Sequence, residues 1–190
     1  MSWAESLEAR GFKRSIAGEQ DFAAAVHALE QMRANHDAYN EAVKRGDLFR
    51  PRRKGIIVSG EYGVGKTCYM DAVSDMFVYR PYRIDLSQPD EVGKLDPKWM
   101  AYNACDLFRQ HVYLDDLGAE LGGNDYGVRF ELVTQFISAY FVRSKGALFI
   151  TTNLRTAEVD KRYNGRILSR LKDLCIPIRF YGKDKRRWEI

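Results

Sequence analysis

The sequence has few cysteines, no long apolar run and no recognisable leader. Cys68, Cys105 and Cys175 stand far apart in a chain of 190 residues, without a CxxC or Cys/His spacing. This pattern argues against a disulfide scaffold and against a zinc site, and it favours a reducing compartment. The longest apolar runs, such as 147–150, fall far short of the ~20 residues that a membrane span needs. The first ten residues lack a basic stretch followed by an apolar one, so we expect a cytoplasmic protein that does not bind a membrane.

Neither sign of charge dominates the composition. The chain has 30 Lys and Arg residues against 26 Asp and Glu residues, and a net charge of +4 is too small to indicate a nucleic-acid-binding protein by itself. Two local clusters are basic, one formed by Arg50, Arg52, Arg53 and Lys54, the other by Lys183, Lys185, Arg186 and Arg187. Either cluster alone is explained by solubilising surface charge, so a binding role needs other observations.

Only five prolines interrupt the chain, and no repeat or linker divides it. Apolar residues at helical spacing predict one amphipathic helix over 21–45, which Gly46 would end. Short apolar runs predict strands at 55–59, 83–86, 112–114, 147–151 and 176–180, with helices at 67–79, 97–109 and 126–143. This alternation is typical of a mainly parallel sheet with right-handed crossovers, which binds ligands at the carboxyl ends of its strands.

Residues 60–67, GEYGVGKT, match the phosphate-binding pattern GxxxxGK[ST] between a predicted strand and a predicted helix. Glycines there let backbone N–H groups approach phosphates, and the helix N-terminus adds partial positive charge. We expect Lys66 to bridge the β- and γ-phosphates and the Thr67 hydroxyl to bind Mg²⁺. The predicted nucleotide-binding residues are Gly60, Glu61, Tyr62, Gly63, Val64, Gly65, Lys66, Thr67 and Cys68.

Two further strand ends carry polar residues that a Mg²⁺-nucleotide site needs. Asp115 and Asp116 end the run HVYLDD, and we expect Asp115 to hold Mg²⁺ and Asp116 to polarise the attacking water. Asn153 follows the next strand, where its amide would bind that water. Alone, Asp-Asp is also typical of a capped turn, and Asn of an Asx turn.

Two arginines, Arg166 and Arg170, lie four residues apart on one face of a predicted helix. A solvated basic face explains them by default. The alternative is an arginine finger, which would enter the nucleotide site of a neighbouring subunit and stabilise charge on the transferring phosphoryl group. Spacing does not choose between these two interpretations.

Taken together, GEYGVGKT, VYLDDLGAE, FITTNL and GRILSRL resemble the AAA+ ATPases of the DnaC/IstB helicase-loader family over about residues 55–187. The resemblance implies an α/β P-loop fold with a five-stranded parallel sheet in the order 5-1-4-3-2, without a full C-terminal helical lid. It implies that Lys66 and Thr67 form Walker A, that Asp115 and Asp116 form Walker B, and that Asn153 is sensor 1. Arg170 would then be the arginine finger, with Arg166 a neighbouring basic contact.

The resemblance also divides the chain and implies its partners. Residues 1–54 would form an N-terminal helical segment with a basic linker, and residues 55–190 the ATPase domain. The cofactors would be ATP and Mg²⁺, and the partners a replicative hexameric helicase, single-stranded DNA and further copies of the chain. Lys183, Lys185, Arg186 and Arg187 would contact DNA or nucleotide. The helix over 21–45 would either contact the helicase or pack against the ATPase domain.

Three functions fit these motifs. The first is a loader of the replicative helicase that hydrolyses ATP. The second is a transposition helper ATPase resembling IstB, which differs from the loader in its partner and not in its catalytic motifs. The third is a small-molecule P-loop kinase, which would need an acceptor pocket and usually an arginine-bearing lid. Asn153 with Arg166 and Arg170 fits an oligomeric ATPase better than a kinase.

Overall fold

The computed structural model describes residues 2–121 and 126–185, and its centre is one parallel sheet. The strands are β1 (Gly55–Ser59), β2 (Tyr82–Asp85), β3 (Val112–Leu117), β4 (Leu148–Thr152) and β5 (Cys175–Arg179). They pair in the order β2-β3-β4-β1-β5, all in parallel. The predicted α/β class and strand order are therefore confirmed.

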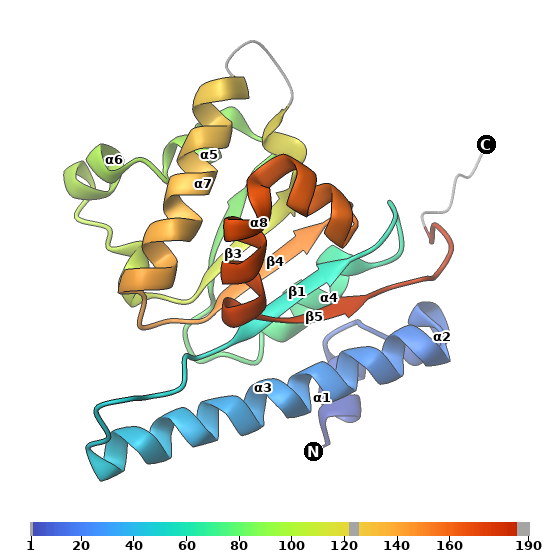
Figure 1. The fold of residues 1–190 in the computed structure, drawn as a ribbon. Helices are drawn as coiled ribbons and strands as arrows, with labels where there is room; N and C mark the ends of the chain where they lie inside the picture. The colour runs from blue at the N-terminus through green and yellow to red at the C-terminus, as the bar shows by residue number, and fades with distance from the viewer. Residues whose placement is uncertain (1, 122–125, 186–190) are drawn as a thin grey trace.

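Helices cover both faces of this sheet (Figure 1). One face carries α5 (Pro89–Gly93), α6 (Pro97–Tyr102), α7 (Tyr126–Arg143) and α8 (Thr156–Leu174), with the short 3-10 helices η1 (Leu107–Arg109) and η2 (Ala119–Leu121). The other face carries α1 (Trp3–Ala9), α2 (Arg14–Ala17), α3 (Glu19–Arg45) and α4 (Lys66–Ser74). Covered on both faces, the central strand β4 is buried at every position, which explains its continuous apolar run.

The long helix α3 begins two residues before the predicted start and ends at Arg45 as predicted. Gly46 follows it with φ = 73°, a left-handed C-cap that glycine adopts without a Cβ penalty. Phe22, Leu29 and Met32 on its first half are buried in one cluster with residues of β1 and α4. Of the two predicted roles for this helix, packing against the nucleotide-binding part is thus the one observed for its first half.

Two predicted helices end earlier than expected. The helix after the phosphate loop stops at Ser74 and not at Tyr79. The segment 97–109 is divided, because Ala104 has φ = 49° and Asp106 caps a new turn by accepting a hydrogen bond from the Phe108 N–H. Beyond β5, residues 180–185 form no helix, and residues 186–190 lie outside the described part. Across 2–121 and 126–185, no helix combines the length and apolarity that crossing a bilayer demands.

Candidate functional site

The phosphate loop, residues 60–67, joins the carboxyl end of β1 to the first turn of α4. Gly63 and Gly65 have φ angles of 74° and 98°, in the left-handed region that residues with a Cβ rarely adopt. Gly65 directly precedes α4, whose first-turn N–H groups have no partner within the helix. Loop glycines and helix amides together make a surface suited to phosphate oxygens.

Lys66 is buried, and its ammonium group bridges the phosphate loop and the neighbouring strand end. Its Nζ lies 3.0 Å from the Gly60 carbonyl oxygen, 2.7 Å from the Glu61 carbonyl oxygen and 2.6 Å from Asn153 Oδ1. Asn153 follows β4, which lies between β1 and β3 in the sheet. The strand order thus carries Asn153 to the phosphate loop, as the sequence motifs require of a residue that binds the attacking water.

Asp116 joins the same network from β3. Asn153 Nδ2 donates to Asp116 Oδ1 at 2.8 Å, and the Asp116 N–H donates to Thr151 Oγ1 at 2.9 Å. The pairing of β3 with β4 shifts register between Leu114 and Leu117, and Asp116 has φ = 64° there. Such a conformation is uncommon for a residue other than glycine and is typical of functional sites.

Burial raises the pKa of Asp116 above its ordinary value, and the neighbouring Asp115 raises it further. Lys66 and the hydrogen bond from Asn153 act in the opposite direction. A carboxylate with a raised pKa is a better proton acceptor than a free aspartate. Asp116 therefore has the chemistry that a general base for water requires.

A cavity of about 290 Å³ opens beside this network. Its lining consists of Tyr62, Gly63, Gly65, Lys66, Thr67, Cys68, Asp116 and Asn153. All eight are residues that the sequence predicted for the site. Thr67 and Asp116 offer a hydroxyl and a carboxylate, and hard oxygen donors of this kind suit Mg²⁺. The residues present therefore fit a magnesium-bound phosphate.

Asp115 lies outside this lining, and its carboxylate is held by other side chains. It is buried, and Oδ1 accepts hydrogen bonds from the Tyr113 hydroxyl at 2.7 Å and from the Thr151 hydroxyl. Oδ2 forms an ion pair with Arg83, whose exposed part also approaches Asp71 at 3.5 Å. The role of Asp115 as a Mg²⁺ ligand stays a prediction, and direct coordination through Oδ2 would require Arg83 to move.

Sequence reasoning missed Arg83 and Tyr113 as neighbours of this site. Strands β2 and β3 place Arg83 opposite Tyr113 and Asp85 opposite Asp115. The predicted strand at 83–86 contained Arg83, but which strand lies beside it depends on the sheet order and register. The available signal was Arg83 itself, a charged residue at the start of the predicted strand 83–86. The structure pairs this strand with β3, which carries Asp115 and Asp116.

The segment after β5 packs against the phosphate loop. The Lys185 N–H donates to the Gly63 carbonyl at 3.0 Å, and Lys185 Nζ donates to the carbonyls of Val64 and Ala17. A Cβ on Gly63 would overlap the carboxylate of Asp184. Lys183 is exposed. The predicted DNA or nucleotide contacts of Lys183 and Lys185 stay predictions, and those of Arg186 and Arg187 fall outside the described residues.

The two arginines lie on α8, and Arg170 is close to its end, where β5 begins. The helix has a break at Asn164, with φ = 66°, and Asn164 Oδ1 accepts hydrogen bonds from the N–H groups of Arg166 and Ile167. Arg166 is exposed, and Arg170 donates to the Ser138 hydroxyl on α7. Ser138 lies on α7, which leads into the amino end of β4. Neither Arg166 nor Arg170 is among the residues that line the cavity of its own chain.

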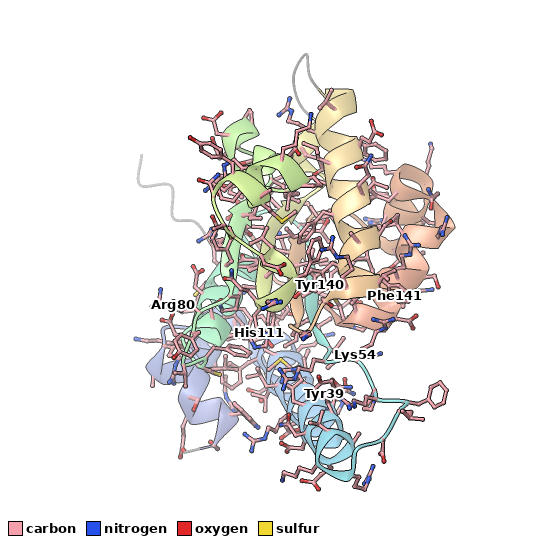
Figure 2. The ribbon with its side chains drawn as sticks, turned by 90° about the vertical axis from the view of Figure 1, so that its left-hand side faces the viewer. Tyr39, Lys54, Arg80, His111, Tyr140 and Phe141 are labelled. Carbon is pink, nitrogen blue, oxygen red and sulfur yellow. The ribbon has the colours of Figure 1, made fainter. Side chains whose placement is uncertain are left out.

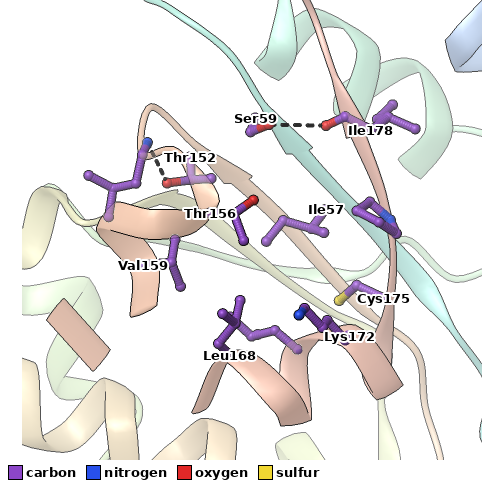
Figure 3. A pocket seen from close by; sticks show the side chains of 12 residues that line it. Ile57, Ser59, Thr152, Thr156, Val159, Leu168, Lys172, Cys175 and Ile178 are labelled. Carbon is purple, nitrogen blue, oxygen red and sulfur yellow. Dashed lines mark hydrogen bonds between the residues drawn. The ribbon is translucent and has the colours of Figure 1, made fainter. Parts of the chain in front are cut away.

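A second cavity, of about 140 Å³, lies between α8 and strands β1 and β5 (Figure 3). Ile57, Val159, Leu168, Leu171 and Cys175 are among its mostly apolar lining. A site of this size and character is comparable to apolar cavities that stay dry or take a molecule as small as benzene. It is unsuited to a triphosphate, so the polar cavity at the phosphate loop is the candidate site.

No family model and no curated protein matches this chain. Among solved structures, the crystal structure of the DnaC helicase loader matches with a TM-score of 0.51 and 22% identity, over 82% of this chain and 89% of that chain. The crystal structure of DnaI matches with a TM-score of 0.50 and 21% identity, over 76% of this chain and 84% of that chain. At this level of identity the likeness concerns the fold, and the predicted resemblance is confirmed at that level: the chain shares the α/β fold of the DnaC and DnaI structures.

Proposed function

We propose that this protein binds and hydrolyses ATP and loads a replicative hexameric helicase onto single-stranded DNA. The observation that carries the proposal is the convergence of Lys66, Thr67, Asp116 and Asn153 on one cavity. These residues come from three segments of the chain, so their meeting depends on the fold and not on the phosphate-loop motif alone. The similarity in fold to DnaC and DnaI supports the choice of a loader.

In this proposal each residue has one task. Lys66 and the loop amides bind the β- and γ-phosphates, while the Thr67 hydroxyl would supply an oxygen ligand to Mg²⁺, which when bound would neutralise charge on the phosphates. Asn153 orients a water molecule whose oxygen attacks the γ-phosphorus. The bond from that phosphorus to the bridging oxygen of ADP breaks, and Asp116 accepts the proton that the water loses.

The strand order favours an ATPase of this kind over a small-molecule kinase. Because β4 lies between β1 and β3, Asn153 stands between the phosphate loop and Asp116, where a water molecule can be oriented. A kinase instead needs room there for an acceptor molecule. The transposition helper keeps the same catalytic residues, and it stays the second candidate because only the partner separates the two.

A partner experiment tests the loader against the transposition helper. The full chain is incubated with a non-hydrolysable ATP analogue and a host extract, recovered by affinity, and its partners are identified by mass spectrometry. We expect the recovered partner to be a hexameric helicase. We also expect purified helicase to gain DNA-unwinding activity on a protein-coated single strand when this protein and ATP are added. Recovery of a transposase without a helicase, together with no gain in unwinding, would overturn the loader.

The helicase contact is proposed for the second half of α3 and the loop after it. Val43 on α3 is 41% exposed, and the following Leu48 and Phe49 are 95% and 94% exposed, although apolar side chains of this size are usually covered. Replacing Leu48 and Phe49 by serine should weaken helicase binding and leave ATP turnover unchanged. An unchanged helicase affinity would remove this surface from the proposal.

A further inference from the structure

Two arginines from distant parts of the chain share one aromatic ring. The guanidinium carbon of Arg52 lies 4.0 Å from the centre of the Phe141 ring, and that of Arg170 lies 5.6 Å from the same centre. Arg52 belongs to the linker before β1, whereas Arg170 belongs to α8. Both are therefore placed by tertiary packing and not by helical spacing.

Each guanidinium is also fixed by a hydrogen bond to α7. Arg52 donates to the Phe141 carbonyl oxygen, and Arg170 donates to the Ser138 hydroxyl. Neither of these two acceptor groups, a backbone carbonyl and a hydroxyl, carries a negative charge. A planar guanidinium held in this way keeps further N–H groups for an anion, in a geometry that matches carboxylate or phosphate.

Within residues 2–121 and 126–185, neither Arg52 nor Arg170 forms an ion pair with a carboxylate. Lys54 lies nearby in the chain, and its ammonium donates to the backbone carbonyl of Lys172 on α8 (Figure 2 labels Lys54 and Phe141). Like charges gathered without a counter-charge repel one another. An anion placed between the two guanidinium groups would remove that repulsion.

The anion is not the nucleotide of the same chain. Arg52 precedes the first residue of β1, whereas the phosphate loop follows the last one. Five residues of strand at about 3.3 Å each separate the two by roughly 16 Å along the sheet. Arg52 is exposed at this amino edge, where a second copy of the chain can reach it.

We propose that Arg52 acts beside Arg170 on the triphosphate bound by a neighbouring copy of the chain, with Phe141 as the residue that positions both. This inference rests on the proposed ATPase function and adds a second arginine to it. The neighbour's cavity carries the matching charge once a triphosphate occupies it, and Arg forks stabilise the charge that the transition state spreads over the phosphoryl oxygens.

A nucleic-acid strand is the competing partner for this basic edge. It would contact exposed cations strung along a groove, with bases stacking on exposed rings. Here the Phe141 ring is half-buried and already carries two guanidinium groups, each tied to α7. Such a compact and fixed pair favours one phosphate group over a mobile strand.

The first test compares Arg52→Ala with Arg53→Ala in ATP turnover by the assembled protein. Arg53 is the matched control, because it follows directly in the chain but packs on Tyr39 at 4.3 Å and donates to Asn40. Arg52→Ala should lower kcat by about a hundredfold with the Kd for ATP nearly unchanged, as expected when a transition-state contact is removed. Equal kcat values for both variants would overturn the proposal.

The second test asks whether Arg52 and Arg170 act from the same subunit. Lys66→Ala lacks a working phosphate loop but keeps both arginines, so mixing it with Arg52→Ala or with Arg170→Ala should restore turnover at the shared interface. A mixture of Arg52→Ala with Arg170→Ala should restore nothing, since every interface then lacks one arginine. Restoration in that last mixture would show that the two do not share an interface, against the proposal.

Two controls separate this proposal from its alternatives. Phe141→Leu keeps an apolar side chain of similar size, and it should lower kcat about threefold with unchanged thermal unfolding, because the ring no longer holds the guanidinium groups. Arg52→Ala should bind an oligo-dT strand with the same salt dependence as the wild type, whereas a lower slope with normal DNA-free turnover would assign Arg52 to nucleic acid. If the wild type hydrolyses no ATP with helicase and DNA present, the proposed ATPase function itself is wrong. That outcome is distinct from equal kcat values for the Arg52 and Arg53 variants, which would overturn only the role of Arg52.

Discussion

The two edges of the sheet hold their charged side chains in different ways. At the carboxyl edge, Lys66, Asn153 and Asp116 form a chain of hydrogen bonds, and Asp115 is paired with Arg83. At the amino edge, Arg52 and Arg170 rest on Phe141 without a carboxylate partner in the part of the chain that the structure describes. The first edge is a network within one chain, in which each change disturbs its neighbours, and the second presents cations for an anion from outside.

The largest effect is expected from a change at Lys66. Among the described residues, Lys66 is the only buried cation that lines the cavity at the carboxyl edge. Lys66→Ala removes the ammonium that joins the loop carbonyls to Asn153, and with it the cation nearest the phosphates. We expect kcat/KM for ATP to fall by about a thousandfold or more. Isothermal titration with ATP and a turnover assay measure the loss. Unchanged ATP binding would show that the cavity is not the nucleotide site.

Asp116→Asn tests the chemistry of the same edge while leaving ATP binding in place. The amide keeps an oxygen that can accept the hydrogen bond from Asn153, so ATP should still bind, while kcat should fall by about a hundredfold because the proton acceptor is lost. Since the pKa of Asp116 is raised, activity of the wild type should fall as the pH drops through that pKa. Turnover measured against pH checks both statements, and a variant with wild-type kcat would exclude Asp116 as the base.

A smaller effect is expected on stability when the ion pair beneath the network is broken. Arg83→Ala leaves the buried Asp115 with hydroxyl donors only, so the free energy of unfolding should fall by about 1–2 kcal/mol, less than for a fully buried pair because Arg83 is half exposed. The control is Arg80→Ala, which breaks an exposed pair with Asp75. Urea unfolding should show a change below about 0.5 kcal/mol for that control. Equal losses for both variants would mean that Asp115 does not depend on Arg83.

Sequence reasoning succeeded where the information is local. Strand positions, the left-handed Gly46 cap and the phosphate loop follow from short patterns, and Asn153 was placed by the strand it ends. The contacts of Asp115 and Phe141 were not predictable in this way. Arg83 meets Asp115 through strand register, and Arg52 meets Phe141 across 89 positions of sequence. Such pairs depend on how distant elements pack.

Sequence reasoning also overestimated helix length where a local cap competes with periodicity. The apolar spacing of 97–109 is compatible with one helix, yet Asp106 accepts the Phe108 N–H and starts a new turn. The short helices α1, α2 and α5 were not predicted, because four to seven residues carry too little periodicity to be recognised. The site was less affected by these errors, since its residues lie at strand ends.

A last effect depends on pH and concerns the amino edge, where His111 lies (labelled in Figure 2). Its surroundings keep the His111 ring neutral. Burial above all, together with the nearby His36 and Arg53, lowers the pKa of His111 to about 4. Its Nδ1 accepts a hydrogen bond from the Ala147 N–H at 3.0 Å. Between the unfolded value of about 6.5 and this lowered pKa, the unfolded chain binds the proton more readily than the folded chain. Stability from the neutral ring is therefore complete above pH 6.5 and is lost as the pH falls toward 4, by at most about 1.4 kcal/mol per pH unit.

Urea unfolding at pH 7 and pH 5 measures this dependence on His111. His111→Asn should destabilise the protein at pH 7 and flatten the decline toward pH 5, because a side chain that does not titrate replaces the ring. His27→Gln serves as the control, since His27 lies exposed on α3, with its ring 2.9 Å from the Gln31 side chain, and its loss should leave the decline unchanged. A decline of the same slope in the His111 variant would show that the acid sensitivity does not come from His111.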